Sequence, residues 1–339
     1  MIKNKPYIIA EIGINHEGKL SNIKKLIYSA KKAGADAVKF QLFKAETLSK
    51  KNSNIKKFFY SKNKKETLFQ MWKRLEIDKK KLNQINKLCK ILKIDLIFSI
   101  FDTESQKKLS KIDYKYIKIA SSDINDFPLL KILKTKKKKF IISTGMANEN
   151  EILKIINYIK KKNLYLLHCV SLYPCPKEKI NINRMISLSK KFKLQVGFSD
   201  HSIGVDACLL ALSKGANIIE KHFTLNKKSD GPDHALSADE NDLKIICDFA
   251  KNVKHLKGSG KIAPTKEELK IKKIARKSIY IKRNIKKGEK FSIKNLEVRR
   301  PESFIEPNML KLILKKKSLF NLNVGDPLKI KYVENFNIK

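Results

Sequence analysis

The stretch from Ile218 to His234 has the sequence "IIEKHFTLNKKSDGPDH". It begins with a short β-branched apolar run, which is typical of a buried strand. The run ends on three ionisable residues, Glu220, Lys221 and His222. One strand that ends in this way carries little information, because every strand must leave the core somewhere. The ends of the other predicted strands therefore decide what this stretch means.

Further apolar runs of the same kind occur along the chain, and amphipathic helical segments alternate with them. The strand candidates are 7–11, 36–40, 95–99, 116–121, 139–144, 164–169, 194–199 and 217–223. Helical patterns lie between them at 20–34, 79–93, 102–111, 149–162 and 204–216. Strands that are buried on both faces and alternate with helices predict a closed parallel barrel or a doubly wound sheet. Eight candidates favour the (β/α)8 TIM barrel.

The segment after the first strand shows how each helix is predicted. Its apolar residues fall on one helical face: Leu20, Ile23, Leu26, Ile27, Ala30 and Ala33. Ser21 is expected to cap the amino end, because its hydroxyl can accept a hydrogen bond from a free backbone N–H. Gly34 is expected to end the helix, because glycine adopts the left-handed conformation without strain.

The pattern changes after Gly258. Residues 259–276 are expected to form a linker with a short helix, and residues 277–339 a small β-rich domain, because short strand patterns alternate there with glycine turns. The stretches 277–301 and 323–335 carry those strand patterns. The first domain, 1–258, has the length of a barrel of about 250 residues.

Composition and charge narrow the class of protein. The 339 residues carry a formal charge of +42. The excess is mostly lysine that is spread along the chain without interleaved arginine and aromatic residues, so we expect solvated lysine faces and no nucleic-acid partner. The five cysteines form no CxxC pair, which indicates reduced thiols. No long apolar segment and no export signal is apparent, so we expect a cytoplasmic protein with no membrane partner.

Polar groups occur at the carboxyl end of every strand candidate. They are Glu11, Lys39, Gln41, Ser99, Lys118, Ser121, Asp123, Ser143, His168, Ser171, Tyr173, Ser199, Asp200, His201, Glu220 and His222. In a parallel barrel these ends converge on one face, where such enzymes have their active sites. The stretch at 218–234 is therefore predicted to be one of eight that supply side chains to a common site.

The residue types indicate the chemistry. Lysines 39 and 118, together with the serine hydroxyls, suit phosphate and carboxylate groups, which accept several hydrogen bonds. His201 and His222 can share one divalent metal ion. The carboxyl groups of Glu11, Asp123, Glu220 and Asp233 can bind metal, water or sugar hydroxyls.

Eight motifs resemble those of the sialic acid (nonulosonate) synthases in order and spacing. They are "AEIGINHEG", "VKFQLF", "KIASSD", "IISTGM", "HCVSLYP", "GFSDHSIG", "EKHFTL" and "GPDHALS". The segment "ARKSIYIKRNIKKGEKFSIKNLEVRRP" resembles the antifreeze-like (SAF) domain that follows the barrel in this family. The resemblance covers essentially the whole chain.

The resemblance implies an activity: condensation of phosphoenolpyruvate with an N-acetylated aminosugar, N-acetylmannosamine or a relative, to a nine-carbon 2-keto acid and phosphate. It implies a Mn²⁺ or Mg²⁺ ion on His201 and His222 and a domain-swapped homodimer. We expect Glu11 or Glu220 to transfer the protons of the water molecule that takes part in the reaction. Phosphoenolpyruvate would be bound by Lys39, Ser99, Lys118, Ser121, Ser143 and Ser199. The sugar would face Glu11, Gln41, Asp123, Tyr173, Asp233 and Arg300, the last from the partner's C-terminal domain.

Some positions depart from the family pattern. Ser99 and Ile100 stand where members usually have Thr-Pro, Asp123 stands where many have Glu, and "ESFIEP" follows the "RRP" that contains Arg300. Two alternatives stay open. One is a legionaminic or pseudaminic acid synthase, which uses a diacetamido-trideoxyhexose. The other is a non-catalytic basic binding protein, which the intact histidines and lysines disfavour.

Overall fold

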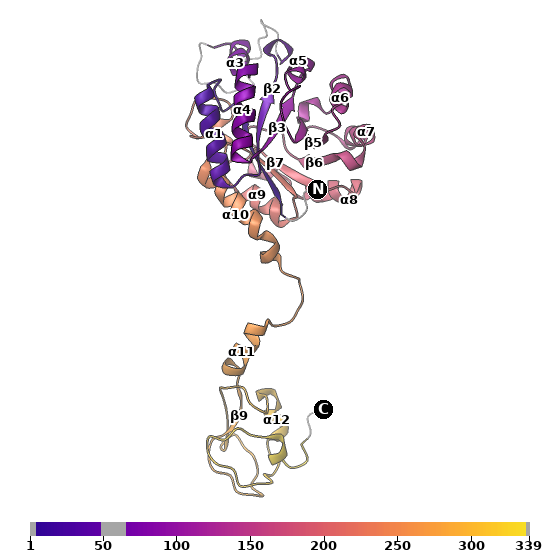
Figure 1. Cartoon of the computed structure of the whole chain (residues 1–339). Coiled ribbons are helices and arrows are strands. Elements are labelled where there is room, and N and C mark those ends of the chain that lie inside the picture. The colour runs from indigo at the N-terminus through magenta and orange to yellow at the C-terminus, as the bar shows by residue number, and fades with distance from the viewer. Residues whose placement is uncertain (1–4, 49–65, 337–339) are drawn as a thin grey trace. The chain divides into compact units, whose positions relative to one another are not determined.

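The computed structural model describes residues 5–48 and 66–336, so the first four residues, on which part of the expectation about export signals rested, lie outside it. The chain divides into two compact units, 1–258 and 259–339. Figure 1 shows helices around the strands of the first unit and a smaller second unit with little regular structure.

The first unit is a closed parallel barrel whose strands pair in sequence order, with β8 returning to β1. The strands are β1 Tyr7–Gly13, β2 Ala37–Leu42, β3 Asp95–Ile100, β4 Tyr116–Ile119, β5 Lys139–Ser143, β6 Leu164–His168, β7 Val196–Asp200 and β8 Ile218–His222. The predicted barrel is confirmed. Each end of a predicted strand lies within two residues of the observed end. Closure removes exposed strand edges, so every strand contributes to one interior.

Helices follow the strands and cover the outside of the barrel. They are α1 Leu20–Ala33, α2 Ala45–Leu48, α3 Leu68–Leu75, α4 Lys79–Leu92, α5 Thr103–Lys107, α6 Phe127–Lys134, α7 Glu149–Ile159, α8 Asn183–Phe192, α9 Asp206–Ser213 and α10 Glu240–Lys257. Side chains of Asp78, Asn148 and Asp239 cap three of them by accepting backbone hydrogen bonds. These caps satisfy N–H groups that the helix itself leaves free.

Two local expectations for these helices differ from the structure. Ser21 does not cap α1, because a backbone turn from His16 to Lys19 starts the helix at Leu20 and leaves Ser21 inside its first turn. Gly34 does end the helix, in the left-handed conformation at φ 96°. The helix predicted over 102–111 is shorter. Only α5, Thr103–Lys107, is helical there, and backbone turns follow it.

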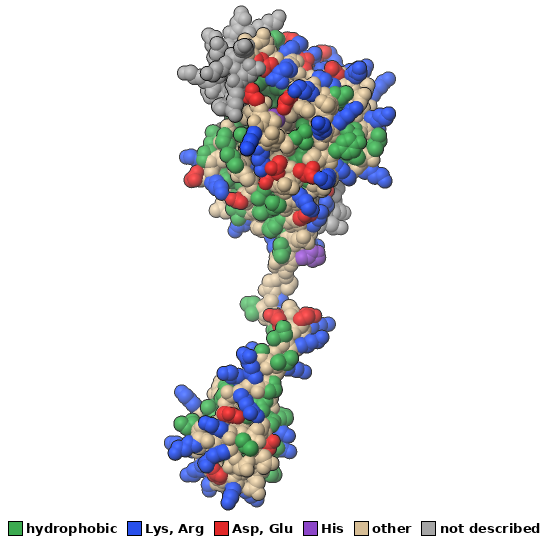
Figure 2. Space-filling model, turned by 90° about the vertical axis from the view of Figure 1, so that its left-hand side faces the viewer, with side chains coloured by type: hydrophobic (Ala, Val, Ile, Leu, Met, Phe, Trp, Pro, Cys, Tyr) green, Lys and Arg blue, Asp and Glu red, His purple; other side chains and the backbone are tan. Residues whose placement is uncertain are grey.

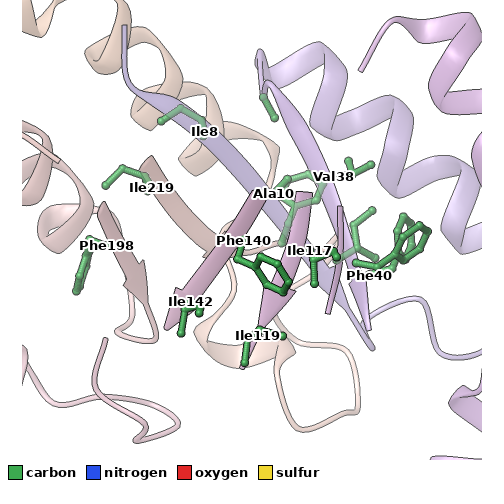
Figure 3. Packing of buried hydrophobic residues seen from close by; sticks show 14 of the residues in the cluster. Ile8, Ala10, Val38, Phe40, Ile117, Ile119, Phe140, Ile142, Phe198 and Ile219 are labelled. Atoms are coloured by element: carbon green, nitrogen blue, oxygen red, sulfur yellow. The ribbon is translucent and has the colours of Figure 1, made fainter. Parts of the chain in front are cut away.

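The main core lies between the barrel wall and the helices. Alternate strand residues such as Ile8, Val38, Phe140 and Ile219 face outward and are fully or almost fully buried by the helices. Figure 3 shows part of this cluster along the strands. Each such side chain contributes about 1.5–3 kcal/mol through burial. Because the helices hold the outer face of the strands, the inner face is free to differ in chemistry.

The second unit has its own small core. The helix α11 Lys266–Ala275 precedes an antiparallel pair, β9 Ser278–Ile281 and β10 Leu296–Arg299, and the short α12 Leu310–Ile313 follows. The core contains Ile279, Ile281, Ile285, Phe291, Leu296, Ile305, Ile313, Leu322, Leu328, Val333 and Phe336. In the predicted strand region 323–335 the structure has single bridge pairs and a 3₁₀ turn, Ile330–Tyr332, because Gly325 turns the chain and Pro327 lacks a backbone donor.

The surface is rich in lysine on both units. Figure 2 shows Lys and Arg side chains scattered over the visible face of each unit, interspersed with acidic and apolar groups. All five cysteines are free and buried. Among the described residues no helix has both the length and the apolar composition needed to cross a bilayer.

Candidate active site

The interior of the barrel is divided into an apolar layer and a polar one. The amino-terminal part is filled by Tyr7, Ile9, Ala37, Ile97, Tyr116, Ile141, Tyr165, Leu167 and Ile218. Further along, the strand register sets Glu11 opposite Lys39, Ser99 opposite Lys118, and Ser199 opposite Glu220. Side chains alternate between the two faces of a strand. Most of these polar residues lie two positions after an apolar interior residue of the same strand, so they also face the interior. The result is a buried polar ring near the carboxyl ends.

Lys39 lies at the centre of one half of this ring. Its Nζ is 2.9 Å from Glu11 Oε2 and donates a 2.9 Å hydrogen bond to Ser99 Oγ. Glu220 Oε2 lies 3.7 Å away on the other side. Gln41 Nε2 donates to the second oxygen of Glu11 at 3.0 Å. The cation is therefore held between two carboxyl groups from β1 and β8.

Lys118 occupies the other half of the ring. Its Nζ donates to Ser143 Oγ at 2.7 Å and to the backbone oxygen of Ile119 at 3.0 Å. Glu220 Oε1 lies 3.8 Å from it and accepts a 2.8 Å bond from Ser199 Oγ. Glu220 thus bridges the two lysines, and the three serines satisfy groups that would otherwise be buried without partners.

Burial and charge pairing act against each other in this ring. Burial raises the pKa of Glu11, and Glu220 adds to the effect, although Lys39 opposes it. Burial would also raise the pKa of Glu220, but Lys118 and Lys39 outweigh burial and lower it. Burial lowers the pKa of Lys118, whereas Glu11 and Glu220 overcome burial and raise that of Lys39. Within one ring the pKa of Glu11 is therefore raised and that of Glu220 is lowered.

The two predicted metal ligands lie together above the ring. The rings of His201 and His222 have centroids 5.6 Å apart, and Tyr173 stacks on His201 at 4.2 Å. His201 Nδ1 lies 2.8 Å from the backbone oxygen of Val170, which can only accept, so Nδ1 carries the proton and Nε2 keeps its lone pair. Burial lowers the pKa of both imidazoles, so both are neutral, as metal ligation requires.

The residues fit a divalent metal ion at this position. His222 Nδ1 is buried without a hydrogen-bond partner in the described structure, although Asp233 Oδ2 lies 3.5 Å away. No cluster of three His, Cys, Asp or Glu side chains arranged for an ion occurs within 5–48 and 66–336. Two histidines would leave the remaining coordination positions to water or substrate oxygens, which is the open arrangement of a catalytic site.

The predicted sugar-facing residues surround this centre in part. Gln41 donates a hydrogen bond to Glu11 of the polar ring, and Tyr173 stacks on His201. Asp233 lies beside His222. Burial, with a smaller contribution from Glu11, raises the pKa of Asp233 to about 7. Asp123 follows β4 in a 3₁₀ turn, and burial raises its pKa to about 6. Arg300 belongs to the second unit and is exposed there.

Ser121 lies in a tight cluster with Ser171, which was also expected at the strand ends, and with Gly145 and Cys169, which were not predicted as site residues. Its Oγ accepts a 3.0 Å bond from the backbone N–H of Gly145 and lies 3.0 Å from Cys169 Sγ. A Cβ atom on Gly145 would lie 2.3 Å from Ser171 Oγ and 2.8 Å from Cys169 Sγ. A larger residue here would require these side chains to shift, and the motif "IISTGM" contains that signal, because a glycine at a strand often marks a close approach of other atoms.

Two strand-end residues expected at the common site lie elsewhere. His168 faces outward from β6, where its Nε2 lies 2.8 Å from the backbone oxygen of Ile180. Asp200 faces outward from β7 and pairs with Lys221. Both expectations were wrong for the same reason: side chains alternate along a strand, so a neighbour of an interior residue is on the outer face.

The fold and the position of these groups define a class of protein, the (β/α)8-barrel enzymes, whose chemistry takes place at the carboxyl ends of the strands. Residues 26–262 match the model of the NeuB family. The chain belongs to the NeuB family.

Relatives with assigned names are similar over most of the chain. The N,N'-diacetyllegionaminic acid synthase of Campylobacter jejuni is 41% identical over 307 residues, 89% of this chain and 92% of the relative. The pseudaminic acid synthase of the same species is 35% identical over 332 residues, 96% of each chain. A solved structure, the N-acetylneuraminic acid (sialic acid) synthetase of Leptospira borgpetersenii, has a TM-score of 0.70 at 31% identity and covers 79% of this chain and 90% of that one.

Proposed function

We propose that this protein is a nonulosonate synthase, which condenses phosphoenolpyruvate with an N-acetylated aminosugar aldehyde to a nine-carbon 2-keto sugar acid and phosphate. The observation that carries the proposal is the pair of buried lysines, Lys39 and Lys118, in one ring with Glu11 and Glu220. Membership of the NeuB family and similarity to three kinds of nonulosonate synthase support it.

Phosphoenolpyruvate would bind in the polar ring. Its phosphate and carboxylate need several donors, and Lys39 and Lys118 supply charged ones while Ser99, Ser121, Ser143 and Ser199 supply hydroxyls. The free site already pairs each lysine with a carboxyl group. An entering anion would add negative charge to this balance. Glu11, whose pKa burial already raises, would take up a proton and offset part of this added negative charge.

The reaction then needs a carbon–carbon bond, a water molecule and two proton transfers. The enol carbon of phosphoenolpyruvate forms a bond to the sugar's aldehyde carbon, and the aldehyde oxygen gains a proton to become a hydroxyl. Water adds at the cationic carbon that carries the phosphate and gives up a proton. The bond from this carbon to the phosphate oxygen then breaks, the new hydroxyl gives up its proton to become the ketone oxygen, and the departing phosphate oxygen gains a proton. Glu11 or Glu220 would exchange the protons of the water molecule, and the position of both carboxyl groups in the polar ring supports this role.

His201 and His222 would hold a Mn²⁺ or Mg²⁺ ion, which supplies Lewis-acid polarisation of the aldehyde carbonyl when bound. Gln41, Asp123, Tyr173 and Asp233 would bind the sugar. Arg300 would reach it from the C-terminal domain of the partner subunit in a domain-swapped homodimer, as the family resemblance implies. Tyr173 is half-exposed, so its ring can pack on His201 and still present an open face to a sugar.

The choice of sugar rests on the motifs and on the names of the relatives. N-acetylmannosamine is the first expectation from the motifs, but the relative with 41% identity is named for a diacetamido sugar acid. We therefore favour a diacetamido-trideoxyhexose of the legionaminic series, with N-acetylmannosamine and the pseudaminic precursor as the competing substrates. The altered segment after Arg300 is consistent with a sugar that differs from N-acetylmannosamine.

A substrate panel tests the proposal. The full chain is incubated with phosphoenolpyruvate, Mn²⁺ and each of the three aminosugars, and phosphate release and product mass are measured. We expect one sugar to give phosphate and a nine-carbon keto acid in equal amounts. The matched control is Lys118→Met, which should lose turnover with its fold intact. A folded, metal-loaded wild-type protein that releases no phosphate with any sugar would favour the non-catalytic alternative.

A further inference from the structure

A buried ion pair lies directly behind the two histidines, on the outer face of the barrel wall. Lys221 Nζ lies 2.8 Å from Asp200 Oδ2, and the side chains are 0% and 1% exposed. Asp200 immediately precedes His201 at the end of β7, and Lys221 immediately precedes His222 at the end of β8. The strand register pairs Asp200 with Lys221. The ion pair therefore joins the two strands one residue before each histidine.

Asp200 also holds the chain on the far side of His201. Its Oδ1 accepts bonds from the backbone N–H of Ser202 at 2.8 Å and from its hydroxyl at 2.7 Å. Lys221 donates a second bond, to the backbone oxygen of Ser202. Cys208 Sγ from α9 lies 3.3 Å from Asp200 Oδ2. His201 is thus enclosed between two residues that are both bonded to the cation preceding His222.

Packing alone does not require charges at this place. The neighbouring outward residues, Phe198 on β7 and Ile219 on β8, are apolar and fully or almost fully buried. Replacing a buried ion pair by apolar groups of similar volume is often neutral or stabilising, since both charges must be desolvated. Hydrogen bonds between charged groups require a defined geometry. They therefore restrict the relative position of the two strands more than apolar contacts do.

We propose that Asp200 and Lys221, together with Ser202, form a clamp that sets the separation and orientation of His201 and His222. These are positioning residues, because they contact neither the polar ring nor the interior face of the histidines. The clamp's effect on metal binding rests on the proposed function. Its effect on the geometry of the two imidazoles does not, since both networks are present in the protein alone.

The test removes both charges together, so that no unpaired charge stays buried. In Asp200→Asn/Lys221→Met, Asn keeps the acceptor for Ser202, and Met matches the length of the lysine chain. We expect the crystal structure of the metal-free variant to keep the barrel but to show His201 and His222 displaced or in several conformers. Mn²⁺ affinity, measured by electron paramagnetic resonance, should fall about 10- to 100-fold. The kcat should fall while KM for phosphoenolpyruvate stays within about twofold, because the polar ring is untouched.

The matched control is Ile219→Ala, which opens a cavity on the same face of β8 without touching the clamp. It should lower the melting temperature and leave Mn²⁺ affinity unchanged. Unchanged imidazole positions and unchanged Mn²⁺ affinity in the double variant would overturn the proposal. If the double variant does not fold, Ser202→Ala decides: it removes one bond to Asp200, and Mn²⁺ affinity equal to that of the wild type would equally overturn it. A wild-type protein without synthase activity would refute the proposed function, while the metal-free structures still decide the clamp.

Discussion

Lys39 Nζ lies 2.9 Å from Glu11 Oε2 inside the closed barrel, and both side chains are almost fully buried. The two residues come from β1 and β2 and face each other in the strand register. A buried cation between two carboxyl groups costs desolvation energy that the protein regains only through good pairing. The pair therefore keeps a cation inside the barrel, where the proposed function needs one for an anionic substrate.

Lys39→Met should weaken phosphoenolpyruvate binding far more than sugar binding. The loss of a buried charge-assisted contact costs about 2–4 kcal/mol, which corresponds to a rise in KM of roughly 30- to 1000-fold. Initial rates at varied concentrations of each substrate measure the two constants. Lys73→Met is the control, because Lys73 also pairs with two carboxylates but lies half-exposed on α3. Equal weakening of both substrates by Lys39→Met would show that Lys39 is structural.

Chelation of divalent ions should abolish turnover, and either Mn²⁺ or Mg²⁺ should restore it. Two neutral imidazoles with open coordination positions suit both ions, and His222 Nδ1 is buried without a hydrogen-bond partner in the described structure. His201→Ala should lose activity at every metal concentration tested. The readout is phosphate release before and after dialysis against a chelator. Full activity of His201→Ala in the presence of chelator would refute the metal site.

A chain that ends at Gly258 should form a folded barrel that binds phosphoenolpyruvate but does not condense it. The barrel's cores lie entirely within 1–258, so the second unit is not needed for its stability. Circular dichroism, calorimetric binding and phosphate release test the three parts. Arg300→Ala in the full chain should give the same result, and Arg283→Ala, a second exposed arginine of that unit, should not.

Mixed dimers test whether Arg300 acts in the partner's site. Inactive Arg300→Ala and inactive His201→Ala subunits, once exchanged, should regain about a quarter of wild-type activity, because half of the dimers are mixed and each has one complete site. Native mass spectrometry verifies the exchange. Verified mixed dimers without activity would show that the domain acts within its own chain or not at all.

His16→Gln should make the protein less sensitive to acid. His16 is completely buried, and burial lowers its pKa to about 3 from an ordinary value near 6.5. Between these values the unfolded chain binds a proton that the folded chain does not, so stability is fully present above pH 6.5 and is lost as the pH falls. This residue contributes a slope of up to about 1.4 kcal/mol per pH unit. Urea unfolding from pH 4 to 7 measures the slope, and equal slopes in both proteins would contradict the prediction.

The sequence alone determined the barrel. Short β-branched runs in alternation with helical segments predict parallel strands, because the period-2 and period-3.6 patterns are local properties of the chain. The number of strands, eight, favours a closed barrel. Motifs at the strand ends also identified Lys39, Lys118, His201 and His222 as candidate site residues. Local detail was less certain: Ser21 has the chemistry of a cap, but a turn upstream starts the helix before it.

Only the tertiary structure decided which strand-end residues share a site. Glu220 and His222 face the interior, whereas Lys221 between them faces the helices and pairs with Asp200, and His168 is likewise outside. A strand that is buried on both faces carries apolar residues on both, so its sequence does not mark which alternate set points inward. Barrel closure and the register between neighbouring strands make that choice. They bring Glu11 to Lys39 and Glu220 to both lysines, contacts between residues that lie far apart in the sequence.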